Sequence, residues 1–283
     1  MWLKIVIGVL FVSMFLGAFY FESTPERKAE TGLERSSGAG TVFRLMSWNI
    51  GYGDLESESR AHVEDLPAVA QVILSHDPDA VAIQELTGES QLKLLLAQLK
   101  NRYHGFVSST GSADRVAAVL VKQRGGKEFL PRFAIVPAGD KFAAAATFRW
   151  NTKVPELVLI SAHADAFSAS RRRVFLADLV DWARNAKKRE ITFIAGDLNF
   201  EVSTHKRSNL FTNDAKHDSE SYAYLLKHFT DVGRDAGETA VNDRRIDYVF
   251  GPLGSASVPR AEVLRGAAIG HMDHWPLLVE IAF

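Results

Sequence analysis

Buried strands and amphipathic helices alternate along most of the chain. Short apolar runs predict strands at Val42–Trp48, Ala80–Gln84, Val116–Val121, Ala143–Phe148, Leu157–Ala162, Ile191–Ala195, Ile246–Phe250 and Leu277–Phe283. Apolar residues three and four apart, with N-terminal signals such as Asp65 before Pro67, predict helices from Asp65 to before Asp77 and over Glu89–Arg102, Arg171–Lys188 and Ser221–Phe229. Many strands with a few interspersed helices predict an α/β or α+β domain built of layered sheets.

The N-terminal segment has a different pattern. Ile5–Phe21 is apolar throughout, and at about 1.5 Å per residue it reaches roughly 25 Å, the short end of a membrane span. We expect an uncleaved anchor within residues 1–21, a flexible linker over 22–40 and a folded domain over 41–283. A cleaved signal peptide is the alternative, with Leu16-Gly17-Ala18 as a poor cleavage site. The short N-terminal tail resembles an export signal, so we expect the domain to lie outside the cytoplasm, in the periplasm or the extracellular space.

Composition narrows the possible functions. Hydrophobic residues make up 47% of the chain and charged residues 24%, which is typical of a globular protein. Lys and Arg number 33 against 34 Asp and Glu, so binding to nucleic acid through bulk positive charge is not expected. The absence of cysteine excludes disulfides, thiolate zinc sites and a cysteine nucleophile.

Short polar motifs stand at the ends of the predicted strands, where a sheet delivers side chains to a crevice. They are Ser47-Trp48-Asn49-Ile50, Gln84-Glu85, Ala162-His163-Ala164-Asp165, Gly196-Asp197-Leu198-Asn199, Arg245-Ile246-Asp247-Tyr248 and Met272-Asp273-His274-Trp275-Pro276. On an extended backbone Asp197 and Asn199 would point to the same side, because they are two residues apart. Carboxylates, amides and imidazoles without a thiol suit Mg²⁺ or Mn²⁺ better than zinc.

Each motif taken alone also has a plain structural interpretation. Asn49 could close a strand in a turn, and Glu85 could cap a helix or lie at the surface. Gly-Asp-x-Asn commonly forms an Asx turn, and His163 could be a buried histidine bonded to Asp165. Arg171-Arg172-Arg173 is most simply a solvated helix start, although positive charge there could also hold a phosphate.

Taken in order, the motifs resemble those of the endonuclease/exonuclease/phosphatase superfamily, which includes pancreatic-type deoxyribonuclease, AP endonuclease, bacterial sphingomyelinase and inositol polyphosphate 5-phosphatase. The resemblance covers about Val42 to Phe283. It implies a four-layered sandwich of two mixed β-sheets packed face to face with helices outside, to which the N-terminal hydrophobic helix is added. It also implies a divalent-metal-dependent hydrolase in which water attacks the phosphorus of a phosphoester, most simply a phosphodiester.

The resemblance assigns a role to each matching residue. For the metal, Mg²⁺ or Mn²⁺, it implies the residues Asn49, Glu85 and Asp273. For catalysis it implies His163 against a phosphate oxygen, Asp197 and Asn199 on water and phosphate, and Asp247 bonded to an essential His274. Met272-Asp273-His274 departs from the Ser-Asp-His of many members, and Ala164-Asp165 also departs from their pattern. We expect the Asp247 carboxylate to lie within hydrogen-bond reach of His274 and to raise its pKa.

The substrate stays open between nucleic acid and a phospholipid or its headgroup. The near-neutral domain weakens the case for a nuclease, and the predicted anchor favours a substrate at a membrane or outside the cell. Against this, Arg171–Arg173, Lys206-Arg207 and Arg244-Arg245 could form a local basic rim for a nucleic-acid backbone. A catalytically inactive binding or scaffolding module on the same fold is the alternative from another class. We expect the domain to be a monomer.

Overall fold

Two six-stranded mixed sheets form the centre of the described structure. The structure is a computed structural model that describes residues 42–51, 62–108, 115–185, 190–202, 215–252, 256–267, 269–270 and 272–283. The first sheet has the order β11 (Ser257–Val263), β12 (Leu277–Ala282), β1 (Val42–Asn49), β2 (Ala80–Leu86), β4 (Val116–Lys122), β3 (Tyr103–Val107). The second has the order β5 (Arg132–Ala138), β6 (Lys141–Phe148), β7 (Leu157–His163), β8 (Ile191–Asp197), β10 (Asp247–Gly251), β9 (Thr230–Asp231).

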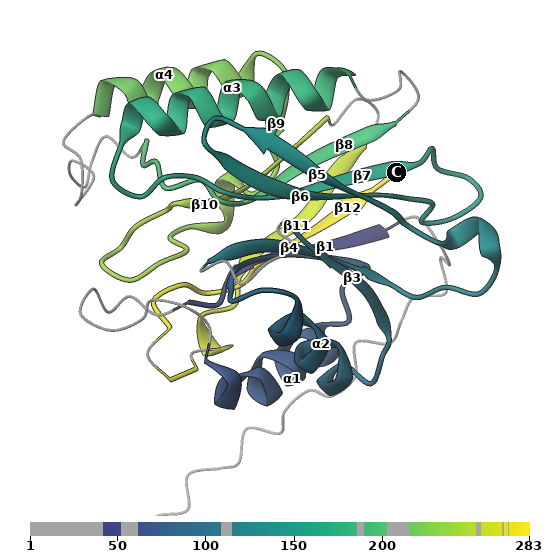
Figure 1. The fold of residues 1–283 in the computed structure, drawn as a ribbon. Helices are drawn as coiled ribbons and strands as arrows, with labels where there is room; N and C mark the ends of the chain where they lie inside the picture. The colour runs from purple at the N-terminus through teal and green to yellow at the C-terminus, as the bar shows by residue number, and fades with distance from the viewer. Residues whose placement is uncertain are drawn as a thin grey trace, which may run out of the picture. The chain divides into compact units, whose positions relative to one another are not determined.

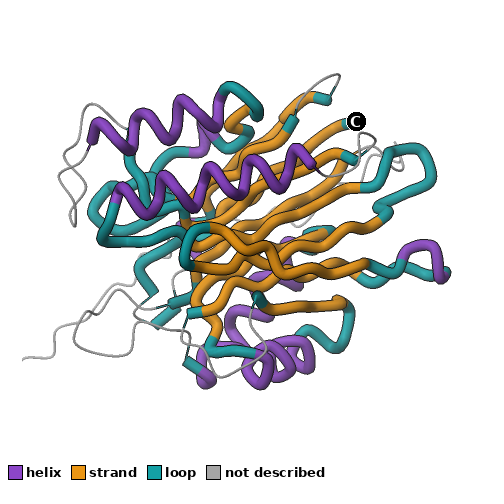
Figure 2. The backbone as a smooth tube through the Cα atoms, turned by 45° about the horizontal axis from the view of Figure 1, so that its top comes forward, coloured by secondary structure: helices purple, strands orange, loops and turns teal. Residues whose placement is uncertain are grey.

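Helices cover the outer face of each sheet (Figures 1 and 2). Helices α1 (Leu66–His76) and α2 (Glu89–Gln98) lie on the first sheet, and α3 (Ala169–Asn185) and α4 (Ala215–Leu226) lie on the second. Short 3₁₀ turns complete the described elements at Val63–Asp65, Lys127–Phe129, Arg234–Ala236 and Arg265–Ala267. The four-layered sandwich that the resemblance implied is therefore confirmed.

Alternation along each strand divides the core into three layers. On β1, Phe43 and Leu45 face the second sheet, whereas Met46 and Trp48 pack toward α1 and α2. The central strands are buried on both faces, which is why they form the uninterrupted apolar runs of the sequence.

The four strands that the sequence did not predict are all edge strands. They are β3, β5, β9 and β11, which lie at the ends of the two strand orders. An edge strand is buried less and tolerates proline, and here Pro137 lies in β5 and Pro259 in β11. Three helices also differ from prediction at their ends, because α2 stops at Gln98, α3 begins at Ala169 and α4 spans Ala215–Leu226.

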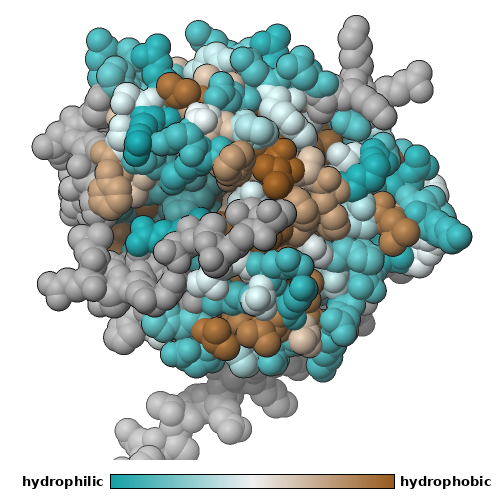
Figure 3. Space-filling model, in the orientation of Figure 1, coloured by the Kyte–Doolittle hydropathy of each residue, from teal (hydrophilic) through white to brown (hydrophobic). Residues whose placement is uncertain are grey.

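No helix in the described part of the chain is both long enough and apolar enough to cross a membrane. The predicted anchor at Ile5–Phe21 and the linker after it lie outside the described residues, so both stay predictions. On the face of the molecule seen in Figure 3, apolar side chains form small separate patches on a mostly hydrophilic surface.

Candidate active site

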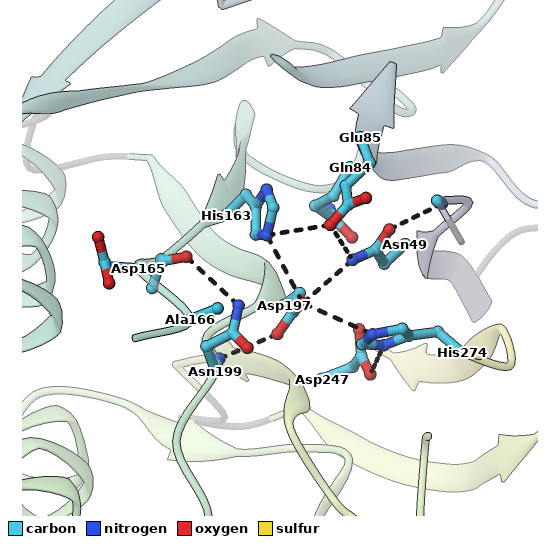
Figure 4. A network of polar contacts seen from close by, with 12 residues as sticks. Asn49, Gln84, Glu85, His163, Asp165, Ala166, Asp197, Asn199, Asp247 and His274 are labelled. Atoms are coloured by element: carbon cyan, nitrogen blue, oxygen red, sulfur yellow. Dashed lines mark hydrogen bonds and ion pairs between the residues drawn. The ribbon is translucent and has the colours of Figure 1, made fainter. Parts of the chain in front are cut away.

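The site is assembled from inner-face side chains at one end of the two sheets (Figure 4). Strands β1 and β2 run parallel, as do β7 and β8, so each pair brings its C-terminal residues to one edge. In the second sheet His163 lies opposite Asp197, and Asp197 lies opposite Asp247. Asn49 ends β1 in the first sheet, and all four of these residues are buried. The strand-end positions that stand out in the sequence therefore converge in space.

Glu85 reaches this crevice through an irregularity in β2. Regular alternation places Gln84 on the inner face, where its Nε2 donates to Ser161 Oγ of the second sheet at 3.0 Å, and would turn Glu85 to the outer face. The β2–β4 register shifts between Ile83 and Leu86, and Glu85 has the left-handed φ of 67°. A bulge of this kind re-aims a side chain, and the carboxylate lies 3.5 Å from His163 Nε2.

The Asp197 carboxylate lies at the centre of the polar network in Figure 4. Its Oδ2 accepts a hydrogen bond from Asn49 Nδ2 at 3.1 Å and lies 3.7 Å from Nε2 of both His163 and His274. Asn49 Nδ2 also donates to Glu85 Oε1 at 3.2 Å within the first sheet, so it is the Asn49–Asp197 bond that ties the first sheet to the second. A polar group held between two sheets in this way has little rotamer freedom.

The expected hydrogen bond between Asp247 and His274 is present, at 2.8 Å from Nδ1 to Oδ2. The ring nitrogen Nε2 is left facing Asp197. Trp48 Nε1 donates to the carbonyl of His274 at 3.2 Å, and Thr239 Oγ1 accepts from the backbone N–H of Asp247 at 3.0 Å. The histidine is thus oriented through its ring and through its backbone.

Asn199 does not follow the extended backbone on which we expected it to share a side with Asp197. Strand β8 ends at Asp197, Asn199 has a φ of 52°, and its N–H donates to Asp197 Oδ1 at 2.9 Å, as in an Asx turn. The Asn199 side chain donates to the carbonyl of Ala164 at 3.3 Å. Lys141 Nζ donates to the same carbonyl at 3.1 Å and to that of His163 at 3.3 Å, which fixes the end of β7.

Burial and neighbouring charges perturb the titratable groups of the site. Burial raises the pKa of the Glu85 carboxyl to about 7 and lowers the pKa of His163 to about 3, so His163 is neutral at physiological pH. Burial also disfavours the charged form of His274, but Asp247 and Asp197 outweigh it and raise the pKa of His274 well above its usual value. The two histidines therefore carry different charges at neutral pH.

The donor atoms fit a divalent cation. Glu85 Oε2 and Asp247 Oδ1 are buried and have no hydrogen-bond partner among the described residues, which is costly unless a cation approaches them. Donor atoms of Asp197, Asp247 and His274 lie within 4.8 Å of one another. Buried carboxylate oxygens of this kind suit Mg²⁺ or Mn²⁺, whereas the protonated ring of His274 does not coordinate a cation. The Asp273 carboxylate, also predicted as a ligand, is partly exposed and lies 3.8 Å from His274 Nε2.

Several residues that shape the site carried no signal, or a weak one, in the sequence. Ser161 and Lys141 lie 77 and 23 residues from the groups that they support, and Thr239 precedes Asp247 by 8 residues across a turn, so no local pattern reveals them. Gly51 follows the Asn49 motif, and a Cβ there would come within 1.9 Å of Glu85 Oε2. A glycine two residues after a polar strand end was therefore the one available clue.

The arginine runs match only in part the solvated helix start that the sequence allowed: Arg171 and Arg173 are exposed near the start of α3, but the arginines that the structure describes are paired with carboxylates. Arg172 is fully buried and pairs with Asp218 at 2.7 Å. The other described members also face carboxylates: Arg171 lies 3.1 Å from Asp140, Arg173 3.4 Å from Glu220, Arg244 3.7 Å from Glu201 and Arg245 2.8 Å from Asp231. Their charge is largely neutralised, while Lys206-Arg207 lies outside the described residues.

Asp165 accepts from the N–H groups of Phe167 and Ser168 at the start of α3 rather than from His163.

Comparisons with known proteins agree with this fold. A model of the Endonuclease/Exonuclease/phosphatase family matches residues 46–269. An endonuclease/exonuclease/phosphatase from Beutenbergia cavernae has a TM-score of 0.64 at 21% identity, covering 86% of this chain and 72% of that one. Humanized D. rerio TDP2 has a TM-score of 0.66 at 15% sequence identity, and the match covers 86% of this chain and 100% of that one. The human Nocturnin catalytic domain with bound sulfate has a TM-score of 0.65 at 17% identity, and the match covers 86% of this chain and 94% of that one. At these identities the structural likeness concerns the fold alone, and no curated protein matches the chain.

Proposed function

The chain belongs to the endonuclease/exonuclease/phosphatase family, a superfamily of metal-dependent phosphoesterases, and on this premise we propose that it hydrolyses a phosphodiester with Mg²⁺ or Mn²⁺. The observation that carries the proposal is the position of Asp197. Its carboxylate accepts a hydrogen bond from the side-chain amide of Asn49 in the first sheet. It also faces two histidines, of which His163 is neutral and His274 is positively charged. A purely structural carboxylate has no need of such surroundings.

The proposed roles follow from these contacts. Asp197 orients the attacking water and takes its proton. General-base catalysis of this kind typically raises the rate by about 10²–10⁴-fold. His274, held protonated and oriented by Asp247, donates a hydrogen bond to the phosphate as negative charge develops there. Three uncharged side chains supply the other hydrogen bonds to the phosphate, namely His163, Asn49 and Asn199.

Glu85 and Asp247 would hold the cation through their buried carboxylate oxygens Oε2 and Oδ1. When bound, the cation neutralises developing charge on the phosphate and stabilises the leaving oxygen. Asp273 is the proposed further ligand at the exposed side of the site.

For the substrate we propose a phosphodiester of either nucleic acid or a phospholipid headgroup. A neighbour in fold, D. rerio TDP2, has been solved with a single-strand DNA product, which supports the first choice. The predicted anchor and exported location support the second. A catalytically inactive binding module is the competing function, and the complete set of site residues argues against it.

A substrate panel tests the proposal. Plasmid DNA, RNA, phospholipid vesicles, inositol phosphates and bis-p-nitrophenyl phosphate are each incubated with Mg²⁺ or Mn²⁺, with and without a chelator. We expect chelator-sensitive hydrolysis of at least one substrate, and its loss in Asp197→Asn. Tight binding of a panel member without turnover would instead identify a binding module.

A further inference from the structure

A cavity of about 390 Å³ lies on the other face of β10 from the candidate active site. Asp247 and Tyr248 are consecutive residues of β10, so their side chains point to opposite faces of the second sheet. Asp247 bonds to His274 in the site, whereas Tyr248 belongs to the core between this sheet and helices α3 and α4. The cavity is lined by Tyr248 and by residues of α4, of the loop after β8 and of the segment between β9 and β10, namely Val202, Ser219, Tyr222, Arg234 and Arg245.

The Arg245 guanidinium is held in a fixed position in this cavity. Its Nη2 donates to both carboxylate oxygens of Asp231 at 2.8 Å, and its Cζ lies 4.3 Å from the centre of the Tyr248 ring. Tyr222 Oη donates to the same carboxylate at 2.9 Å, which restrains it further. The Nε–H of Arg245 is buried and has no hydrogen-bond partner among the described residues. Because a buried N–H without a partner is costly, an acceptor that reaches this atom would bind favourably.

Arg234 brings a second positive charge to the cavity. It lies in the 3₁₀ turn after β9, is exposed, and forms no ion pair within the part of the chain that the structure describes. Asp231 offsets the charge of Arg245, so the charge of Arg234 is left over. Ser219 of α4 adds a hydroxyl group. Each polar side chain that lines the cavity can therefore donate a hydrogen bond, and the charged ones are cations.

This set of groups fits a small organic anion. Guanidinium groups bind phosphate and carboxylate oxygens through charge-assisted hydrogen bonds, which are stronger than those between neutral groups. Val202 and the ring of Tyr222 offer apolar surface, which an inorganic ion alone would not use. A volume of about 390 Å³ is near the lower end of the range for small-molecule sites, so the ligand is a small molecule.

We infer that this cavity is a second binding site, separate from the active site, for a small organic oxyanion whose charged group is a phosphate ester or a carboxylate. Arg234 and the Nε–H of Arg245 bind the oxygens, and Tyr222 and Val202 contact the apolar part. The inference goes beyond the proposed function, because it involves neither the metal nor turnover.

The test titrates phenyl phosphate, benzoate and uncharged phenol into the protein with a chelator present. Metal is left out because a cation in the active site would attract the probes there. We expect calorimetry to show binding of phenyl phosphate, benzoate or both, but not of phenol, and the NMR signal of the Arg245 Nε–H to shift with it. Arg234→Gln should weaken binding about 10–100-fold, as the loss of a charge-assisted contact predicts. Ser219→Glu places a negative charge in the cavity and should abolish binding.

Arg149→Gln is the matched control. Arg149 is also exposed and forms no ion pair among the described residues, but it does not line the cavity, so its replacement should leave affinity unchanged. Equal weakening in Arg149→Gln and Arg234→Gln would show general attraction to positive charge and overturn the inference. Weakening in His274→Gln without weakening in Arg234→Gln would place the anion in the active site and overturn it too. The same holds if neither anionic probe binds.

Failure of this inference is distinguishable from failure of the proposed function. Turnover of bis-p-nitrophenyl phosphate with Mg²⁺ or Mn²⁺ reports on the function alone, whereas the titrations use neither metal nor substrate.

Discussion

Replacement of Glu85 by glutamine should stabilise the metal-free protein and abolish its response to metal. The Glu85 carboxyl is buried, and its pKa rises from 4.5 to about 7 mainly because burial disfavours the ionised form. At about 1.4 kcal/mol per pKa unit, ionised Glu85 costs the folded protein on the order of 3 kcal/mol at pH 8. The loss of stability is therefore absent below pH 4.5, grows as the pH rises from 4.5 to about 7, and is complete above the folded pKa.

The expected quantity is the stability difference between Glu85→Gln and the wild type at two pH values. Between pH 5 and pH 8 this difference should grow by about 2–3 kcal/mol in favour of the variant. In a domain of this size that corresponds to a change in Tm difference of about 4–12 °C. Comparing two pH values removes any constant cost of placing the amide next to Asn49, because that cost is the same at both.

Metal should reverse the order of stability. A cation at about one thousand times its dissociation constant adds about 4.1 kcal/mol to the wild type, which exceeds the roughly 3 kcal/mol that ionised Glu85 costs at pH 8. The variant lacks the carboxylate charge and should gain little. Because the proton must leave Glu85 before the cation binds, wild-type affinity should also fall by up to tenfold per pH unit below pH 7.

Thermal and urea denaturation at pH 5 and 8, with chelator or with Mg²⁺, measures both effects. Glu89→Gln is the matched control, since Glu89 is exposed and pairs with Lys93 across one helical turn at 2.9 Å. The stability of this variant should stay within about 0.5 kcal/mol of the wild type. If the difference between Glu85→Gln and the wild type is the same at both pH values, the penalty assigned to the buried carboxylate is refuted.

Three further predictions concern the site and the chain terminus. Asp247→Asn should lower kcat much more than it raises KM, and combined with His274→Ala it should cost no more than His274→Ala alone; multiplying effects in steady-state kinetics would contradict a shared role. Gly51→Ala should weaken metal affinity about 10–100-fold, since its Cβ would clash with the Glu85 carboxylate, and unchanged metal titrations would contradict this. The chain truncated to residues 40–283 should be a soluble, active monomer, while the full chain should sediment with membranes unless the segment 5–21 is a cleaved signal.

Local burial explains why much of the fold could be predicted. The central strands β1, β2, β7 and β8 are largely covered on both faces, so their sequences are mostly apolar and can be recognised without knowledge of their neighbours. The polar residues at their ends stand out against these runs for the same reason. Candidate site residues could therefore be chosen by position alone, and their order along the chain indicated the family.

Edge strands and paired charges could not be predicted in this way. Whether β5 or β11 forms a strand depends on a neighbour that accepts its backbone hydrogen bonds, since each contains a proline. Arg172 belongs to a run of three arginines typical of a solvated helix start, yet it is fully buried because Asp218, 46 residues away, supplies the opposite charge. The local composition of a segment does not indicate which distant strand or side chain will pair with it.

The sequence by itself determined which residues are available at the strand ends, because alternation and burial are local properties of the chain. The tertiary structure decided which of them meet. Glu85 faces the crevice only because the β2–β4 register shifts and its own backbone is left-handed, and Asp247 reaches His274 only because separate segments come together at one end of the sandwich. Distance in space between residues far apart in sequence is set by packing of the two sheets, and no pattern along one strand encodes it.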